Sequence, residues 1–135
     1  MKKPPTDREL LKLIYESYYD EFNSYDEDTS ERSTKLYVPI DCVEIAKQLD
    51  VDEDIVFGRL YYHLDKKYGY TQDDGVKVHL FSMRINKDRH VIHFPLLSAV
   101  LAELEQSNFR FVAPITLSLI ALAFSIFAFA WGIKG

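Results

Sequence analysis

The chain has 135 residues and a formal net charge of −5, with 21 Asp and Glu against 16 Lys and Arg. All of the acidic residues lie in the first 109 positions, and an acidic domain argues against a general nucleic-acid binder, because phosphate neutralisation supplies much of that affinity. Cys42 is the only cysteine, which excludes a disulfide framework and a cysteine zinc site and is typical of a reducing compartment.

The first predicted element is an amphipathic helix from about Asp7 to Phe22. Thr6 and Glu9 have the spacing of a capping box, in which each side chain satisfies a free backbone N–H at the start of the helix. Apolar residues then recur at helical spacing. The following segment, 23–34, is acidic and rich in turn-forming residues, so we expect a mobile, solvated loop.

A short strand is predicted at 35–40, with Pro39 at a sheet edge or at a strand end because it has no N–H to donate. Asp41 is placed to cap the next helix, and Asp52 to cap a longer helix that runs to about Tyr68. The buried face of the first of these two helices is predicted to comprise Val43, Ile45, Ala46 and Leu49.

Two β-rich runs, 76–85 and 90–94, predict a hairpin that turns at Lys87-Asp88. This register places apolar residues on one face, as a half-buried hairpin requires. A helix is predicted again from 96 to 105. The expected cross-strand pairs are Phe81 with Phe94 and Met83 with Ile92.

The order helix, strand, helix, tight turn, helix, hairpin, helix resembles the winged helix-turn-helix superfamily. The local match is EIAKQLDV at 44–51, followed by Val56 and Leu60, which is similar to the two helices and the turn of that motif. The resemblance covers roughly residues 7–105. It implies an α+β fold, with a three-helix core and a β-hairpin wing, and it makes 52–68 the recognition helix.

The predicted recognition helix differs from that of DNA-binding members. It begins with three carboxylates at 52–54, which repel a phosphate backbone. Phe57 and Tyr61 are one turn apart and, with Tyr62, predict an exposed aromatic patch of the kind enriched in protein interfaces. The alternative is that Phe57 and Tyr61 are core residues packed against the first helix. We take all three as candidate partner-binding residues.

Basic residues in the same region are compatible with ligands other than a protein. Residues 55–94 hold more basic than acidic side chains, which suits contact with nucleic acid or with anionic lipid headgroups. A solvated surface is the alternative. The candidates for such contacts are Arg59, Lys66, Lys67, Lys87 and Arg89.

The sequence shows no pattern typical of an enzyme. His90 and His93 are three apart on a predicted strand, so their side chains point to opposite faces. Cys42 has no histidine near it in sequence and is interpreted as a small buried residue. The five glycines are scattered and form no phosphate-binding loop. We expect no catalytic residue, no metal site and no cofactor.

The segment 111–133 contains no charged residue and is flanked by Arg110 and Lys134. As a helix it would be ~34 Å long, enough to cross a hydrocarbon core of ~30 Å. The N-terminus has no apolar signal region, so we expect the preceding domain to be cytosolic and the protein to be a single-pass, tail-anchored membrane protein. The expected organisation is a cytosolic winged-helix-like domain at 1–106, a hinge at 107–110 and a transmembrane helix at 111–133.

Small residues recur along this span at spacings of three and four. Small side chains let membrane helices approach closely, so we expect the span to self-associate or to dock against another membrane helix. Chance in an Ala- and Ser-containing span is the alternative. We call these positions the seam, and they are Ser118, Ala121, Ser125, Ala128 and Gly132.

These patterns predict a membrane protein whose cytosolic domain is a protein-interaction or regulatory module and whose span forms a homo-oligomer. Protein partners at the membrane are expected, and nucleic acid is less favoured. One alternative is a membrane-tethered, DNA-binding transcriptional regulator. Another is a small membrane effector or pore-forming protein with a sensing domain.

Overall fold

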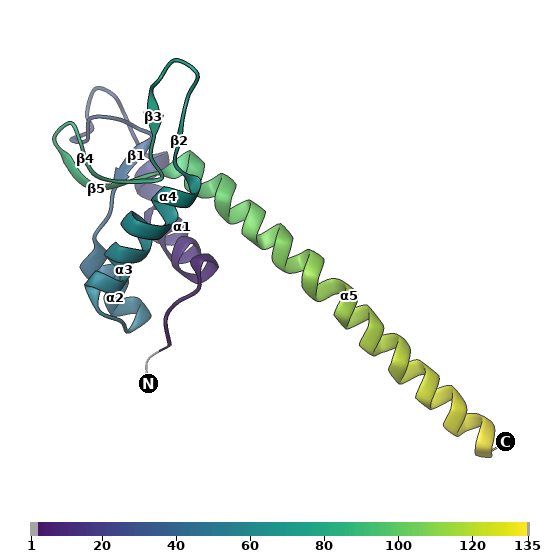
Figure 1. Ribbon diagram of the computed structural model, residues 1–135. Coiled ribbons are helices and arrows are strands. Elements are labelled where there is room, and N and C mark those ends of the chain that lie inside the picture. The colour runs from purple at the N-terminus through teal and green to yellow at the C-terminus, as the bar shows by residue number, and fades with distance from the viewer. Residues whose placement is uncertain (1–2, 135) are drawn as a thin grey trace. The chain divides into compact units, whose positions relative to one another are not determined.

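A computed structural model describes residues 3–134 and confirms an α+β fold followed by one long apolar helix (Figure 1). One compact unit ends at Leu101 and a second begins at Ala102. The elements in chain order are α1 (Asp7–Asn23), β1 (Tyr37–Pro39), α2 (Cys42–Leu49), α3 (Glu53–Gly58), the π-helix η1 (Arg59–Leu64), α4 (Asp65–Tyr68), β2 (Tyr70–Thr71), β3 (Lys77–Val78), β4 (Phe81–Ile85), β5 (Asp88–His93) and α5 (Phe94–Lys134).

The predicted caps begin the first three helices. The Thr6 hydroxyl accepts a hydrogen bond from the Glu9 N–H at 3.1 Å, which starts α1. The Asp41 carboxylate accepts from Val43 and Glu44 at the start of α2. Asp52 accepts from the N–H two residues on at the start of α3. Each cap satisfies an N–H that has no partner inside its helix.

The predicted helix at 52–68 is present, as the consecutive segments α3, η1 and α4. Its middle segment has the wider π-helical turn, which the apolar spacing does not indicate. Val56, Leu60 and Leu64 form its fully buried stripe. In α2, Ile45 and Ala46 are buried as expected, whereas the prediction for Val43 was wrong because 44% of this residue is exposed.

The main sheet has the strand order β1-β5-β4, with both pairs antiparallel. Strand β1, which contains Pro39, is an edge strand as predicted. The predicted hairpin register was wrong by two residues, because Asn86-Lys87 forms the turn and Phe81 therefore lies opposite Ile92. Asn86 has a positive φ of 53°, which asparagine tolerates better than most residues.

The run predicted as one strand at 76–85 is divided. Its first part, β3, pairs with β2 to form a second, two-stranded sheet, and β4 begins after the break at His79-Leu80. Gly75, with a φ of +87°, lies in the turn of this small hairpin. The hairpin precedes β4 and was not predicted.

The core of the first unit lies between α1, the long helix, the sheet and the start of α5. Phe94, predicted to end the hairpin, instead begins α5, where its ring stacks on Tyr15 and Phe22 of α1. Cys42 is buried, as interpreted from the sequence. The largest fully buried side chains include Leu10, Leu11, Ile14, Ile45, Leu60, Leu64, Leu80, Phe81, Ile92, Phe94 and Leu97.

Helix α5 is long and apolar enough to cross a membrane, and no residue in its most apolar stretch is buried among the described residues. The helix continues through 107–110 without a break, so a hinge at that place would be a bend within a helix rather than a loop. Pro114 lies inside α5, although the predicted span places it in a first turn.

A candidate protein-contact surface

Five ring-bearing residues from the long helix and the β4–β5 hairpin form one cluster, here called the aromatic surface: Phe57, Tyr61, Tyr62, Phe81 and His90. The Phe57 ring stacks on Tyr61 with centroids 5.4 Å apart and meets Phe81 edge-on at 5.7 Å. Tyr62 meets Tyr61 edge-on at 5.0 Å. These offset and edge-on geometries are the favourable ones for aromatic pairs.

Burial changes steadily across the aromatic surface. Phe81 is fully buried, Phe57 is half-buried, Tyr61 is 37% exposed and Tyr62 is 70% exposed. The rings that contact Phe57 lie on η1, β4 and β5 rather than on α1. Phe57 thus connects the core to two exposed tyrosine rings, and it is not packed against the rings of the first helix.

Two unusual backbone conformations occur at the aromatic surface. Tyr61 and Tyr62 lie in the π-helix η1, and π-helical turns occur often at functional sites. His90, whose ring lies 5.6 Å from that of Phe57, has a φ of +51° inside strand β5. Positive φ is uncommon for residues other than glycine and is concentrated at functional positions.

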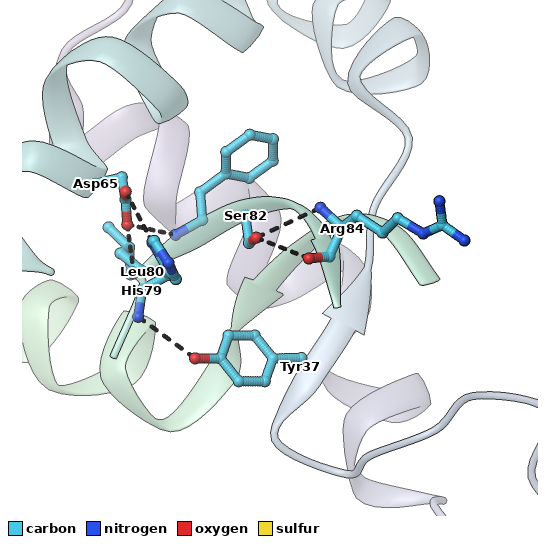
Figure 2. A network of polar contacts seen from close by, with 7 residues as sticks. Tyr37, Asp65, His79, Leu80, Ser82 and Arg84 are labelled. Carbon is cyan, nitrogen blue, oxygen red and sulfur yellow. Dashed lines mark hydrogen bonds and ion pairs between the residues drawn. The ribbon is translucent and has the colours of Figure 1, made fainter. Parts of the chain in front are cut away.

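The helix that carries the aromatic surface is fixed to the sheet by Asp65 (Figure 2). Its carboxylate accepts hydrogen bonds from the backbone N–H of Leu80 at 2.8 Å and of Phe81 at 3.3 Å. Its other oxygen lies 3.2 Å from Nδ1 of His79. The backbone N–H of His79 donates to the Tyr37 hydroxyl at 3.4 Å. The Asp65 side chain is only 13% exposed, so these bonds also compensate for its lost hydration.

A cleft of ≈ 390 Å³ adjoins the aromatic surface. Lys66 of α4 and Lys77 of β3 lie on its walls, and both are exposed. Neither ammonium group pairs with a carboxylate among residues 3–134. We call this the lysine cleft, and it is lined by Tyr61, Tyr62, Asp65, Lys66, Gly69, Lys77 and His79.

The five basic candidates are not equivalent. The Arg59 guanidinium donates to the Asp7 carboxylate at 2.8 Å and to the Pro5 carbonyl at 2.9 Å, so it fixes the N-terminal segment to η1. Lys66 and Lys67 are exposed on α4. Lys87 is exposed in the turn of the β4–β5 hairpin, and Arg89 is exposed on β5.

Sequence reasoning missed several members of this region. Phe81 and His90 join the aromatic surface, and Lys77 and His79 line the lysine cleft, although all four lie outside the helix, in the strands and turns that come after it. Their only sequence signal is that the hairpins follow the helix directly. Asp65 has no signal at all, because a carboxylate within a helix resembles any solvated residue.

All five seam residues lie on helix α5 and are exposed. The Ser125 hydroxyl donates to the Ala121 carbonyl at 3.0 Å, and the Thr116 hydroxyl donates to the Val112 carbonyl at 3.1 Å. These hydroxyls are therefore satisfied within the helix, as an apolar environment requires. A Cβ added at Gly132 would meet no described atom within 4 Å.

The groups available to a ligand are the rings of the aromatic surface and, in the lysine cleft, two ammonium groups and the His79–Asp65 pair. Within the described range 3–134, no group of three or more His, Cys, Asp or Glu residues is placed to hold a metal ion. Comparison with known proteins finds no family model, no curated protein and no solved structure that matches this chain.

Proposed function

We propose that this chain is a membrane-anchored interaction module, which self-associates through α5 and binds a protein partner through the aromatic surface. The observation that carries the proposal is the graded burial from Phe81 to Tyr62. The exposed tyrosine rings are held in place by packing on buried aromatic rings. A partner therefore gains ring contacts at a low cost in side-chain entropy.

Helix α5 supports the membrane part of the proposal. No residue in its most apolar stretch is buried within the described chain, and an exposed apolar face of this extent needs a bilayer or another chain to cover it. Internal bonding of Thr116 and Ser125 removes the main cost of placing them in hydrocarbon. Trp131 is well placed for an interfacial aromatic belt. We further propose that the first unit faces the cytosol.

We also propose that the first unit is winged-helix-like. Its element order and the sheet order β1-β5-β4 support this arrangement, in which the last strand lies between the first and the hairpin strand. The wing itself is reduced, since only Asn86-Lys87 join β4 to β5. The additional β2–β3 hairpin extends the connection from the long helix instead.

Two observations favour a protein partner over duplex DNA on the helix 52–68. Asp52, Glu53 and Asp54 are all exposed at its start, where they would face the phosphate backbone. Arg59, the basic candidate nearest that start, is paired with Asp7. A DNA-binding mode would therefore depend on Lys66, Lys67 and the β4–β5 hairpin.

The test is purification of the full-length protein in mild detergent from cell membranes, compared with a variant carrying Tyr61→Ser and Tyr62→Ser. The proposal predicts a stoichiometric partner protein that the variant loses. A matched control, Tyr19→Ser with Tyr70→Ser, also removes two exposed tyrosines and should retain it. Equal recovery with all three proteins, or recovery of none, would contradict the proposed role of the aromatic surface.

A further inference from the structure

The first unit carries an acidic segment at the end of α1 and in the connection that follows it. Residues 20–31 include six carboxylates and no basic residue. Asp26, Glu27, Asp28 and Glu31 are exposed. None of these four carboxylates forms an ion pair within the described part of the chain. We call residues 26–31 the acidic loop.

Arg32 holds the acidic loop in shape without neutralising it. Its guanidinium donates to the carbonyls of Glu21 at 2.9 Å and Phe22 at 3.2 Å, which closes the C-terminal end of α1. It also lies over the Tyr25 ring, 4.7 Å from the centroid. Within the loop, the Ser30 N–H donates to the Asp26 carbonyl at 2.8 Å. These bonds define the path of the backbone through the segment 23–34, which was predicted to be a loop.

The lysine cleft has the complementary character. It offers two exposed ammonium groups, from Lys66 and Lys77, beside the rings of Tyr61 and Tyr62. Lys67 adds a third exposed cation on α4. On a protein whose net charge is negative, this cleft is a locally basic place, so an approaching acidic segment is steered towards it.

We infer that the lysine cleft of one copy receives the acidic loop of a second copy anchored in the same membrane. The contact is head-to-tail, because cleft and loop are different surfaces of one chain, so it can extend to further copies. Exposed Lys–carboxylate pairs contribute little individually. The inference therefore rests on the proposed function, since anchoring and the seam supply the effective concentration that a weak contact requires.

The test is energy transfer between donor- and acceptor-labelled full-length proteins, reconstituted in vesicles of zwitterionic phosphatidylcholine so that lipid charge cannot compete for the lysines. One variant carries Lys66→Glu and Lys77→Glu, and another carries Asp26→Lys and Asp28→Lys. Each variant alone should show an apparent association constant lower by about tenfold, because attraction becomes repulsion. An equal mixture of the two variants should restore association, since the reversed cleft then meets the reversed loop.

The control variant, Lys12→Glu with Lys47→Glu, makes the same charge change at exposed positions on α1 and α2 and should associate as the wild type does. The inference would be overturned if either the cleft variant or the loop variant, measured alone, associated as the wild type does. It would also be overturned if the mixture of the two variants did not regain association. Recovery in the mixture cannot come from misfolded chains.

Seam variants separate this inference from the proposed function. If Ala121→Leu with Ala128→Leu leaves energy transfer at the wild-type level, association through the span fails while the charge-swap result stands by itself. If seam variants lose association but the charge variants do not, the cleft–loop contact fails and the proposed function stands.

Discussion

The carboxylate of Asp65 lies 2.8 Å from the backbone nitrogen of Leu80, which fixes the end of the long helix to the residue that precedes strand β4. The same carboxylate oxygen also accepts a hydrogen bond from the backbone N–H of Phe81, the fully buried member of the aromatic surface. One side chain thus sets the distance between the helix that carries Tyr61 and Tyr62 and the strand that supports them.

Replacing Asp65 with alanine should lower the free energy of unfolding by about 2–3 kcal/mol, because two backbone N–H groups lose their acceptor in a poorly hydrated place. Asp65→Asn should cost less, since an amide oxygen still accepts from Leu80. Urea unfolding of the full-length protein in detergent, followed by far-ultraviolet circular dichroism, measures both. Equal losses would show that the charge, rather than the accepted bonds, is what matters.

The Arg59–Asp7 pair should couple α1 to η1. Both side chains are about three-quarters buried, so we expect a coupling free energy of about 1.5–3 kcal/mol, as is typical of a charge-assisted hydrogen bond. A double-mutant cycle with Arg59→Met and Asp7→Asn measures it. Strictly additive single effects would mean that the pair contributes nothing, and Arg59 would then be available to bind an anion.

Stability should fall on mild acidification because of His93. Burial lowers the pKa of His93 below its ordinary value of 6.5, and its Nδ1 accepts from the Leu96 N–H at 3.1 Å, which caps α5. The unfolded chain therefore binds the proton more readily. The stabilisation is complete above pH 6.5 and declines as pH falls from there towards the lowered pKa.

His93→Asn keeps an acceptor for the Leu96 N–H but does not titrate in this range. Between pH 7 and pH 5 the variant should lose less stability than the wild type, measured by thermal unfolding in detergent at each pH. Parallel curves for the two proteins would place the acid sensitivity elsewhere.

The Cys42 thiol should be unreactive in the folded protein. Burial, followed by the charges of Asp41 and Glu53, raises its pKa from 9.0 to about 11. At pH 8 the thiolate population should be roughly 100-fold below that of an ordinary cysteine. Iodoacetamide labelling, quantified by mass spectrometry, should be slow in buffer and fast in urea. Rapid labelling of the folded protein would indicate an accessible, reactive thiol.

Local signals in the sequence predicted much of the fold. Thr6, Asp41 and Asp52 begin helices as expected, because a cap involves residues only two or three positions apart. The apolar stripe of Val56, Leu60 and Leu64 was also predictable, since burial repeats with the helical period.

Non-local choices could not be predicted in the same way. The hairpin register depends on whether Asn86-Lys87 or Lys87-Asp88 turns, and both dipeptides contain a turn-forming residue. Asp65 lies 15 residues from Leu80, with an unpredicted hairpin between them. The candidate surface was therefore recognised only at Phe57, Tyr61 and Tyr62, whereas Phe81, His90 and the lysine cleft required the fold.

The central claim is that α5 brings copies of this chain together in a bilayer. Energy transfer between labelled full-length proteins in phosphatidylcholine vesicles tests it with two matched variants, each with a pair of Ala→Leu changes seven residues apart. Ala121→Leu with Ala128→Leu lies on the seam, and Ala123→Leu with Ala130→Leu lies on the opposite side of the helix. We predict that only the seam variant loses association; equal behaviour of the two variants would contradict the account.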